Sequence, residues 1–392
     1  MANSSVAVVS NRPRLEFLDG LRGISALAVV FAHMLAIQNL TLPPALLHWI
    51  GACAHFAVVI FIVLSGYCLM MPVAASATGE MQSVTGFFVR RARRILPPYY
   101  VALFAALAFA ELIAHKHHQH LDRNDVLAHL FLVHNLSRAW YQGFCGPLWS
   151  VPVEWQIYFL MPFVFLPIWR AAGSAAAVAI GLAIGYLPHI LLPTAWNFDW
   201  SCPWFAGLFA LGMLGASATF TGDSHKDRWL RGLPWAPIAL AATAALFAVY
   251  WGVPLLRDQF WALDPICGLA ALAAIVHSAL AMRSATPRMT PLASICESKP
   301  ALTIGMFSYS LYLIHLTTLK VFDACFGKHI PSPDKLMMIH IFIAGPIILC
   351  VSYAFYRLIE KPFMTSHRSF RFVGVHREDL PAATAEATKT AA

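Results

Sequence analysis

Ten apolar segments of about 20 residues recur along this chain, and they constrain its fold more than any other feature of the sequence. A helix needs about 20 apolar residues to cross the hydrocarbon core of a bilayer. Only 12% of the residues are charged and 59% are hydrophobic, whereas soluble domains average about 25% and about 45–50%. The sequence therefore predicts an all-α polytopic membrane protein with about ten transmembrane helices, and it excludes nucleic-acid-binding domains and ordinary cytosolic enzymes. We expect the spans near residues 18–40, 49–72, 97–115, 148–169, 173–193, 201–220, 235–253, 261–282, 302–322 and 337–359.

The rest of the chain indicates a simple domain organisation and a definite orientation. We expect a cytoplasmic N-terminal segment over residues 1–17, one transmembrane domain over 18–363, and a polar, disordered tail over 364–392. With the N-terminus in the cytoplasm, 20 of the 27 Lys and Arg residues fall in cytoplasmic segments. Positive charge accumulates on the cytoplasmic side of membrane proteins, so we expect both termini there.

Ionisable residues inside the first span are candidate functional positions, because each is costly to place in lipid. Asp19, Arg22 and His33 fall on one helix face, with Arg22 and His33 about 16 Å apart along the axis. Asp19 and Arg22 are three residues apart and are expected to pair. The alternative is that Asp19 and Arg22 are interfacial anchors and that His33 is an ordinary packed histidine.

Four arginines, Arg90, Arg91, Arg93 and Arg94, precede the third span. Guanidinium groups bind phosphate oxygens in a bidentate manner, so this cluster has the chemistry of a phosphate clamp. A positive anchor at the cytoplasmic surface explains the same residues. The following Pro97–Pro98 pair is expected to fix the start of the helix and to hold the cluster at the membrane surface.

The fourth span opens with Trp149, Ser150, Glu154 and Tyr158. Glu154 is expected about 10 Å inside the outer face, with Tyr158 one turn deeper on the same side. A buried carboxylate needs a partner, so Glu154 is a strong functional candidate.

The ninth span carries Ser308, Tyr309, Tyr312 and His315, and His315 is expected at a depth similar to that of His33. Ordinary helix packing explains the two tyrosines equally well.

Taken in this order, the motifs resemble those of the acyltransferase-3 family, integral membrane O-acyltransferases that are mostly bacterial and that acylate surface sugars, exopolysaccharides or antibiotics. The resemblance runs from about Arg14 to Phe363, with Ile62 and Pro152 as departures from the family pattern. Some members carry an additional esterase-like domain after the last span, and we expect this chain to be the stand-alone type. The matching residues are Arg22 and His33, Phe61 to Tyr67, the pairs Arg90–Arg93 and Arg91–Arg94, Trp149, Ser150 and Glu154, Ser308 to His315, and Tyr356 to Phe363.

The resemblance implies an acyl-CoA donor from the cytoplasm, with acetyl-CoA the expected form, and a sugar-containing acceptor from outside, such as an exopolysaccharide or lipopolysaccharide unit. It implies an inner-membrane location. We expect His33 to act either as general base on the acceptor hydroxyl or as an acylated intermediate. We expect Glu154 to orient His33, to raise its pKa, or to position the acceptor from the outer side. The remaining implied site residues are Asp19 in the catalytic group, Arg22, Arg90, Arg91, Arg93 and Arg94 for the coenzyme, and Trp149, Ser150, Tyr158, Ser308, Tyr309, Tyr312 and His315 for the substrates.

Other functions stay open at this point. A small antibiotic or a lipid-type molecule is an alternative acceptor. A transporter with a midplane site built from Arg22, His33 and Glu154 is the rival from another class, although the sequence has no evident internal repeat. The histidine run from His115 to His120 has metal-binding chemistry, but such runs are usually incidental, so we expect no metal. The eight cysteines form no CxxC pair and indicate neither a zinc site nor a disulfide framework.

Overall fold

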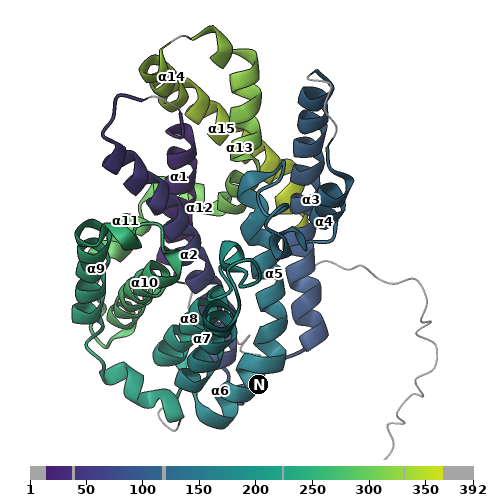
Figure 1. Ribbon diagram of the computed structural model, residues 1–392. Helices are drawn as coiled ribbons and strands as arrows, with labels where there is room; N and C mark the ends of the chain where they lie inside the picture. Colours follow the sequence, from purple (N-terminus) through teal and green to yellow (C-terminus); the bar gives the residue numbers. More distant parts are fainter. Residues whose placement is uncertain (1–14, 38–39, 117–120, 223–224, 331, 365–392) are drawn as a thin grey trace, which may run out of the picture.

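The computed structural model describes residues 15–37, 40–116, 121–222, 225–330 and 332–364, and within them the chain forms helices and connecting segments without a strand. The expected disordered tail lies outside the described residues, apart from Met364. Figure 1 shows the helices gathered into one bundle. The α-helices are α1 Phe17–Met34, α2 Pro44–Ala74, α3 Val84–Lys116, α4 Arg123–Leu130, α5 Ser150–Leu160, α6 Leu166–Ala172, α7 Ser174–Leu191, α8 Phe205–Phe220, α9 Trp235–Gly252, α10 Phe260–Arg283, α11 Pro291–Cys296, α12 Lys299–Met306, α13 Ser308–Cys325, α14 Pro333–Ile339, α15 Gly345–Phe355 and α16 Lys361–Met364.

The membrane fold predicted from the sequence is confirmed. Among the described residues, nine helical segments are long and apolar enough to cross a membrane, and α12 with α13 makes a tenth if this bent pair is one span. Two of the nine contain more than one α-helix: α5 and α6 run together within Gly146–Ala172, and α14 to α16 run within Pro333–Met364, each through short π-helical turns.

The ninth span is bent, which the prediction of a continuous helix over 302–322 missed. α12 and α13 meet at Phe307 at an angle of 75°. The cause is a close contact between α12 and α1: a Cβ atom on Gly305 would lie 2.1 Å from the backbone oxygen of Asp19. Because Gly23 likewise faces Ala301 at a distance too short for a side chain, α12 lies directly on the beginning of α1 and turns away from the axis of α13.

The start of α3 also differs from the prediction, because the helix begins at Val84 and continues through Pro97 and Pro98. Proline removes a backbone donor, but membrane helices tolerate it where neighbouring groups satisfy the freed carbonyls. The two prolines free the carbonyls of Arg93 and Arg94. Next to them, Tyr309 of α13 donates its hydroxyl to the carbonyl oxygen of Ile95, at 3.1 Å, and so holds α3 against α13. The four arginines therefore lie on a helix with fixed faces.

α2 lies at the centre of the bundle, where it packs on α1, α8 and α10. We name the two ends of the bundle by residues. The basic end is where α1 begins at Phe17, α2 ends at Ala74 and α3 begins at Val84. The opposite end is where α1 ends at Met34 and α2 begins at Pro44.

Candidate active site

Two adjoining cavities lie among α1, α2, α3, α5 and α13. The first has a volume of about 330 Å³ and is lined by Arg22, Arg91 and Arg94; we call it the arginine chamber. The second has a volume of about 290 Å³ and is lined by His33 and His55; we call it the histidine chamber. Val58 and Tyr312 line both chambers and so form the boundary between them.

The arginine chamber carries an excess of positive charge. Arg22 donates from Nη1 to Oδ1 of Asp19 at 2.9 Å, which confirms the predicted pairing. Arg91 and Arg94 come from α3, and within the described residues the buried Nε of Arg91 has no hydrogen-bond partner. Three guanidinium groups and two carboxylates, Asp19 and Glu154, thus line the chamber, and the unpaired Nε of Arg91 suits it to an anionic ligand.

Helix α3 places the four predicted arginines on two different faces. Arg91 and Arg94 are three residues apart, share one face of α3 and line the chamber, whereas Arg90 and Arg93 are exposed and do not. Only two of the four arginines are therefore in position to contact a ligand in this cavity.

Glu154 belongs to the arginine chamber. Its Oε1 accepts hydrogen bonds from the hydroxyls of Ser65 and Tyr158, both at 2.6 Å. The expected contact in which Glu154 orients His33 does not form, because Glu154 faces α2 at Ser65 while His33 lines the other chamber.

His33 is oriented instead by a carbonyl and a second histidine. Its Nδ1 lies 2.8 Å from the Val29 carbonyl oxygen and 3.3 Å from Nε2 of His315. Nδ1 of His315 lies 2.8 Å from the Tyr312 carbonyl oxygen. A carbonyl only accepts, so each Nδ1 carries a hydrogen and His315 Nε2 accepts from His33. The lone pair of His33 is therefore on Nε2, and His315 lies at the depth of His33 as predicted.

Tyr312 is held rigidly at the boundary between the chambers. Its hydroxyl donates to the Pro147 carbonyl oxygen at 2.5 Å and lies 2.7 Å from Oγ of Ser150. Since the single hydroxyl hydrogen goes to Pro147, Ser150 is the donor in the second bond.

The other predicted substrate-binding residues fall on both sides of this boundary. Tyr158, Ser308 and Tyr309 line the arginine chamber, and Trp149 lines the histidine chamber. Apart from Arg90 and Arg93, the predicted residues thus line the two chambers or, like His315, contact a residue that does.

Sequence reasoning gave no role to several residues that the structure brings to this region. Ser310 donates from its backbone N and its hydroxyl to Oε2 of Glu360, which is 1% exposed and joins the last span to α13. His55 and Gln142 line the histidine chamber. A histidine inside the second apolar span and a glutamate at the end of the last one were signals that could have identified His55 and Glu360.

Comparison with known proteins identifies the family. The acyltransferase domain of the acyltransferase-3 family matches residues 15–357. This chain belongs to that family. The resemblance drawn from the sequence is confirmed, because the family model that matches is that of an acyltransferase domain and not of a transporter.

Two relatives extend the comparison. A Bacillus subtilis protein named "Putative peptidoglycan O-acetyltransferase YrhL" is 30% identical over 388 aligned residues, covering 92% of this chain and 57% of that protein. The peptidoglycan O-acetyltransferase OatA of Listeria monocytogenes is 29% identical over 189 residues, covering 44% of this chain and 28% of that protein. The match thus spans little more than half of the first relative and less than a third of the second. No solved structure matches the chain.

Proposed function

We propose that the protein is an O-acetyltransferase that moves an acetyl group from acetyl-CoA to a hydroxyl of a sugar-containing acceptor. The observation that carries the proposal is the pair of chambers that meet at Val58 and Tyr312, one lined by arginines and the other by His33. Both relatives are named as peptidoglycan O-acetyltransferases. A peptidoglycan-type sugar chain is therefore the acceptor we favour, ahead of an exopolysaccharide or lipopolysaccharide unit.

The donor binds with its phosphates in the arginine chamber. Arg22, Arg91 and Arg94 supply guanidinium groups, and charge-assisted hydrogen bonds to phosphate are among the strongest in proteins. The unpartnered Nε of Arg91 gains a partner on binding. The narrow pantetheine arm then runs along α1 past Tyr312, and the eleven residues from Arg22 to His33 cover about 16 Å.

His33 is the general base of the transfer. Its Nε2 takes the proton of the acceptor hydroxyl as the hydroxyl oxygen attacks the acetyl carbonyl carbon. The carbon–sulfur bond breaks, the coenzyme leaves as a thiolate, and the imidazolium returns the proton to the sulfur. His315 and the Val29 carbonyl keep the hydrogen on Nδ1 throughout, so His315 acts as a positioning residue.

Direct transfer is the route we favour over an acyl-histidine, because each substrate has a chamber of its own and the two chambers share Val58 and Tyr312 in their linings. The basic end faces the cytoplasm of a bacterial cell, where acetyl-CoA is made, and the opposite end faces the acceptor. Steady-state kinetics with both substrates varied should give intersecting lines. Parallel lines would favour the acyl-histidine route.

The proposal is tested by labelled acetyl transfer with the purified, reconstituted protein. The acceptor is a soluble peptidoglycan fragment, and the donors are acetyl-CoA and S-acetylpantetheine, which has the same thioester without the nucleotide phosphates. We expect sugar-linked label with acetyl-CoA and a Michaelis constant at least tenfold higher for S-acetylpantetheine. Equal Michaelis constants for the two donors would show that the arginine chamber does not bind the donor. Absence of label on every sugar hydroxyl would contradict the proposed function.

A further inference from the structure

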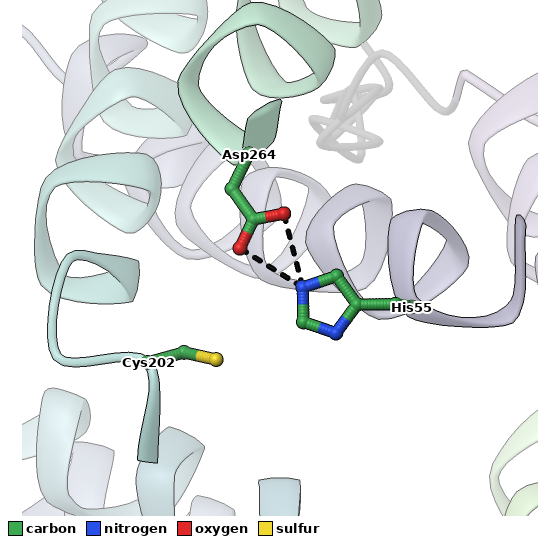
Figure 2. A group of neighbouring side chains, drawn as sticks. All are labelled: His55, Cys202 and Asp264. Carbon is green, nitrogen blue, oxygen red and sulfur yellow. Dashed lines mark hydrogen bonds and ion pairs between the residues drawn. The ribbon is translucent and has the colours of Figure 1, made fainter. Parts of the chain in front are cut away.

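A second histidine, His55 of α2, lines the histidine chamber and has no part in the transfer steps above. Its Nε2 lies 3.0 and 2.9 Å from the two carboxylate oxygens of Asp264 on α10, as Figure 2 shows. A carboxylate only accepts, so this nitrogen carries a hydrogen. The other carboxylate donor is the indole of Trp204, whose Nε1 lies 2.8 Å from Oδ2.

Asp264 is fully buried, and in the described part of the chain no lysine or arginine bonds to it. A buried carboxylate without such partners is expensive, so His55 and Trp204 are what keep it in place. The pairing fixes the orientation of the imidazole. It leaves Nδ1 as the nitrogen without a hydrogen bond among the described residues.

Aromatic rings restrain His55 further and give the chamber a surface suited to a sugar. Phe260 stacks on the imidazole with ring centroids 3.8 Å apart. Trp149, which lines the same chamber, is parallel to it within 7°, with centroids 6.2 Å apart. At about 290 Å³ the chamber is near the lower limit of about 300 Å³ for small-molecule sites, a size for one sugar residue at a time.

We propose that His55 is an acceptor-binding residue, held by Asp264, whose Nδ1 hydrogen-bonds a sugar hydroxyl other than the one that His33 deprotonates. The inference rests on the proposed function and deepens it. A hydroxyl both donates and accepts, so the bond forms with a neutral or a protonated imidazole. His33 of α1 and His55 of α2 then each hydrogen-bond a different hydroxyl of one sugar. These two contacts select the hydroxyl that receives the acetyl group.

Metal binding is the alternative role for His55 and Asp264, because the sulfur of Cys202 lies within 4.8 Å of their ligand atoms. Two ligands of one tetrahedral zinc ion, each about 2.0–2.2 Å from the metal, lie about 3.3 Å or more apart. His55 and Asp264 are 2.9 Å apart with a hydrogen between them, and Trp204 already bonds to Asp264. The observed contacts favour a hydrogen-bonded pair.

His55→Gln is the informative variant, because the glutamine amide nitrogen replaces Nε2 as donor to Asp264 while the group at Nδ1 is lost. We expect the acceptor Michaelis constant to rise about three- to tenfold, the effect of one hydrogen bond, with the donor constant unchanged. Acetyl groups should also spread to other hydroxyls of the product sugar. His48→Gln is the matched control, since His48 lies on the same helix, pairs with Asp258 at 2.9 Å and does not line the chamber.

His55→Asn provides the reverse change, because it retains a polar atom near Nδ1 and loses the bond to Asp264. This variant should bind the acceptor nearly as well as wild type but unfold at a lower temperature. An acceptor constant for His55→Gln equal to that of wild type, or an equal rise in both constants, would overturn the proposal. So would one zinc ion per chain that is lost in Cys202→Ser. Absence of sugar acetylation by wild type would overturn the proposed function as well.

Discussion

The arginine chamber and the histidine chamber share a wall, yet their polar groups differ in kind. Arginine stays charged at every physiological pH, whereas histidine gains and loses a proton near neutrality. The first chamber therefore suits recognition of a fixed charge, and the second suits proton transfer. Histidine–aspartate pairs are also unevenly distributed between the ends of the bundle, since His225–Asp227 lies at the basic end and five pairs lie toward the opposite end: His48–Asp258, His55–Asp264, His129–Asp125, His189–Asp199 and His340–Asp323. In the proposed function, recognition of the coenzyme charge and proton transfer therefore take place in separate cavities.

Removing the imidazole of His33 should lower the rate of transfer more than any of the other changes. We expect His33→Ala to lower kcat by at least about a hundredfold, because general base catalysis contributes about 10²–10⁴ in rate. His48→Ala, which changes a histidine outside both chambers, is the control for folding and insertion. If the His33→Ala enzyme retains more than about a tenth of the wild-type rate, His33 is not the general base.

Neutralising the arginine chamber should weaken donor binding without changing the chemistry. For Arg91→Gln with Arg94→Gln we expect a donor Michaelis constant raised roughly 10- to 100-fold, the effect of lost charge-assisted bonds, and an acceptor constant near wild type. The matched variant is Arg90→Gln with Arg93→Gln, which removes the same charge from the exposed face of α3. If the two double variants raise the donor Michaelis constant equally, the arginines only fix the orientation of the protein in the membrane.

Closing the boundary between the chambers should slow transfer while both substrates still bind. A phenylalanine at position 58 adds volume where the two cavities meet, so Val58→Phe is expected to lower kcat about tenfold with smaller changes in both Michaelis constants. Val58→Ala removes volume from the same place and should keep most of the activity. If Val58→Phe is as active as Val58→Ala, the thioester does not pass this boundary.

Replacing His134, which lies at the opposite end of the bundle, should have the smallest effect, and the effect should appear in stability and not in activity. His134 is fully buried and stacks on His129 with centroids 3.8 Å apart; burial, together with His129, lowers the pKa of His134 to about 3. In the unfolded chain this group titrates near 6.5. The unfolded state therefore binds more protons below pH 6.5, and the stability contributed by neutral His134 is lost as pH falls toward 3.

His134→Gln should flatten this pH dependence, because glutamine keeps a donor near the Leu148 carbonyl and does not titrate. Between pH 6 and 4, the wild type should lose up to about 1.4 kcal/mol per pH unit more than the variant. Thermal unfolding midpoints of both proteins at pH 6 and pH 4 measure the difference. Identical shifts would mean that His134 is already accessible to protons in the folded state.

Local features of this fold were predictable from the sequence. Asp19 and Arg22 pair because residues three apart on a helix are neighbours, and the same periodicity put His33 on their face. The depth of His315 followed from counting residues along its span, and the order of the motifs was sufficient to identify the family.

Features that depend on contacts between distant segments were not predictable in this way. The bend at Phe307 arises from Gly305 lying against Asp19, almost 300 residues earlier in the chain. Which arginines enter the chamber depends on the face that α3 turns toward α13. Glu154 is a local signal, but its partner Ser65 comes from another helix.

The most direct test of the two-chamber account is sidedness in vesicles that hold the protein in one known orientation. Acetyl-CoA is confined to the side of the basic end, and a sugar oligomer too large to cross the bilayer is confined to the other side. We predict acetylation in this arrangement and none with the two substrates exchanged, because the arginines that hold the coenzyme phosphates line the chamber nearer the basic end. Transfer only when both substrates are on the same side would contradict the account.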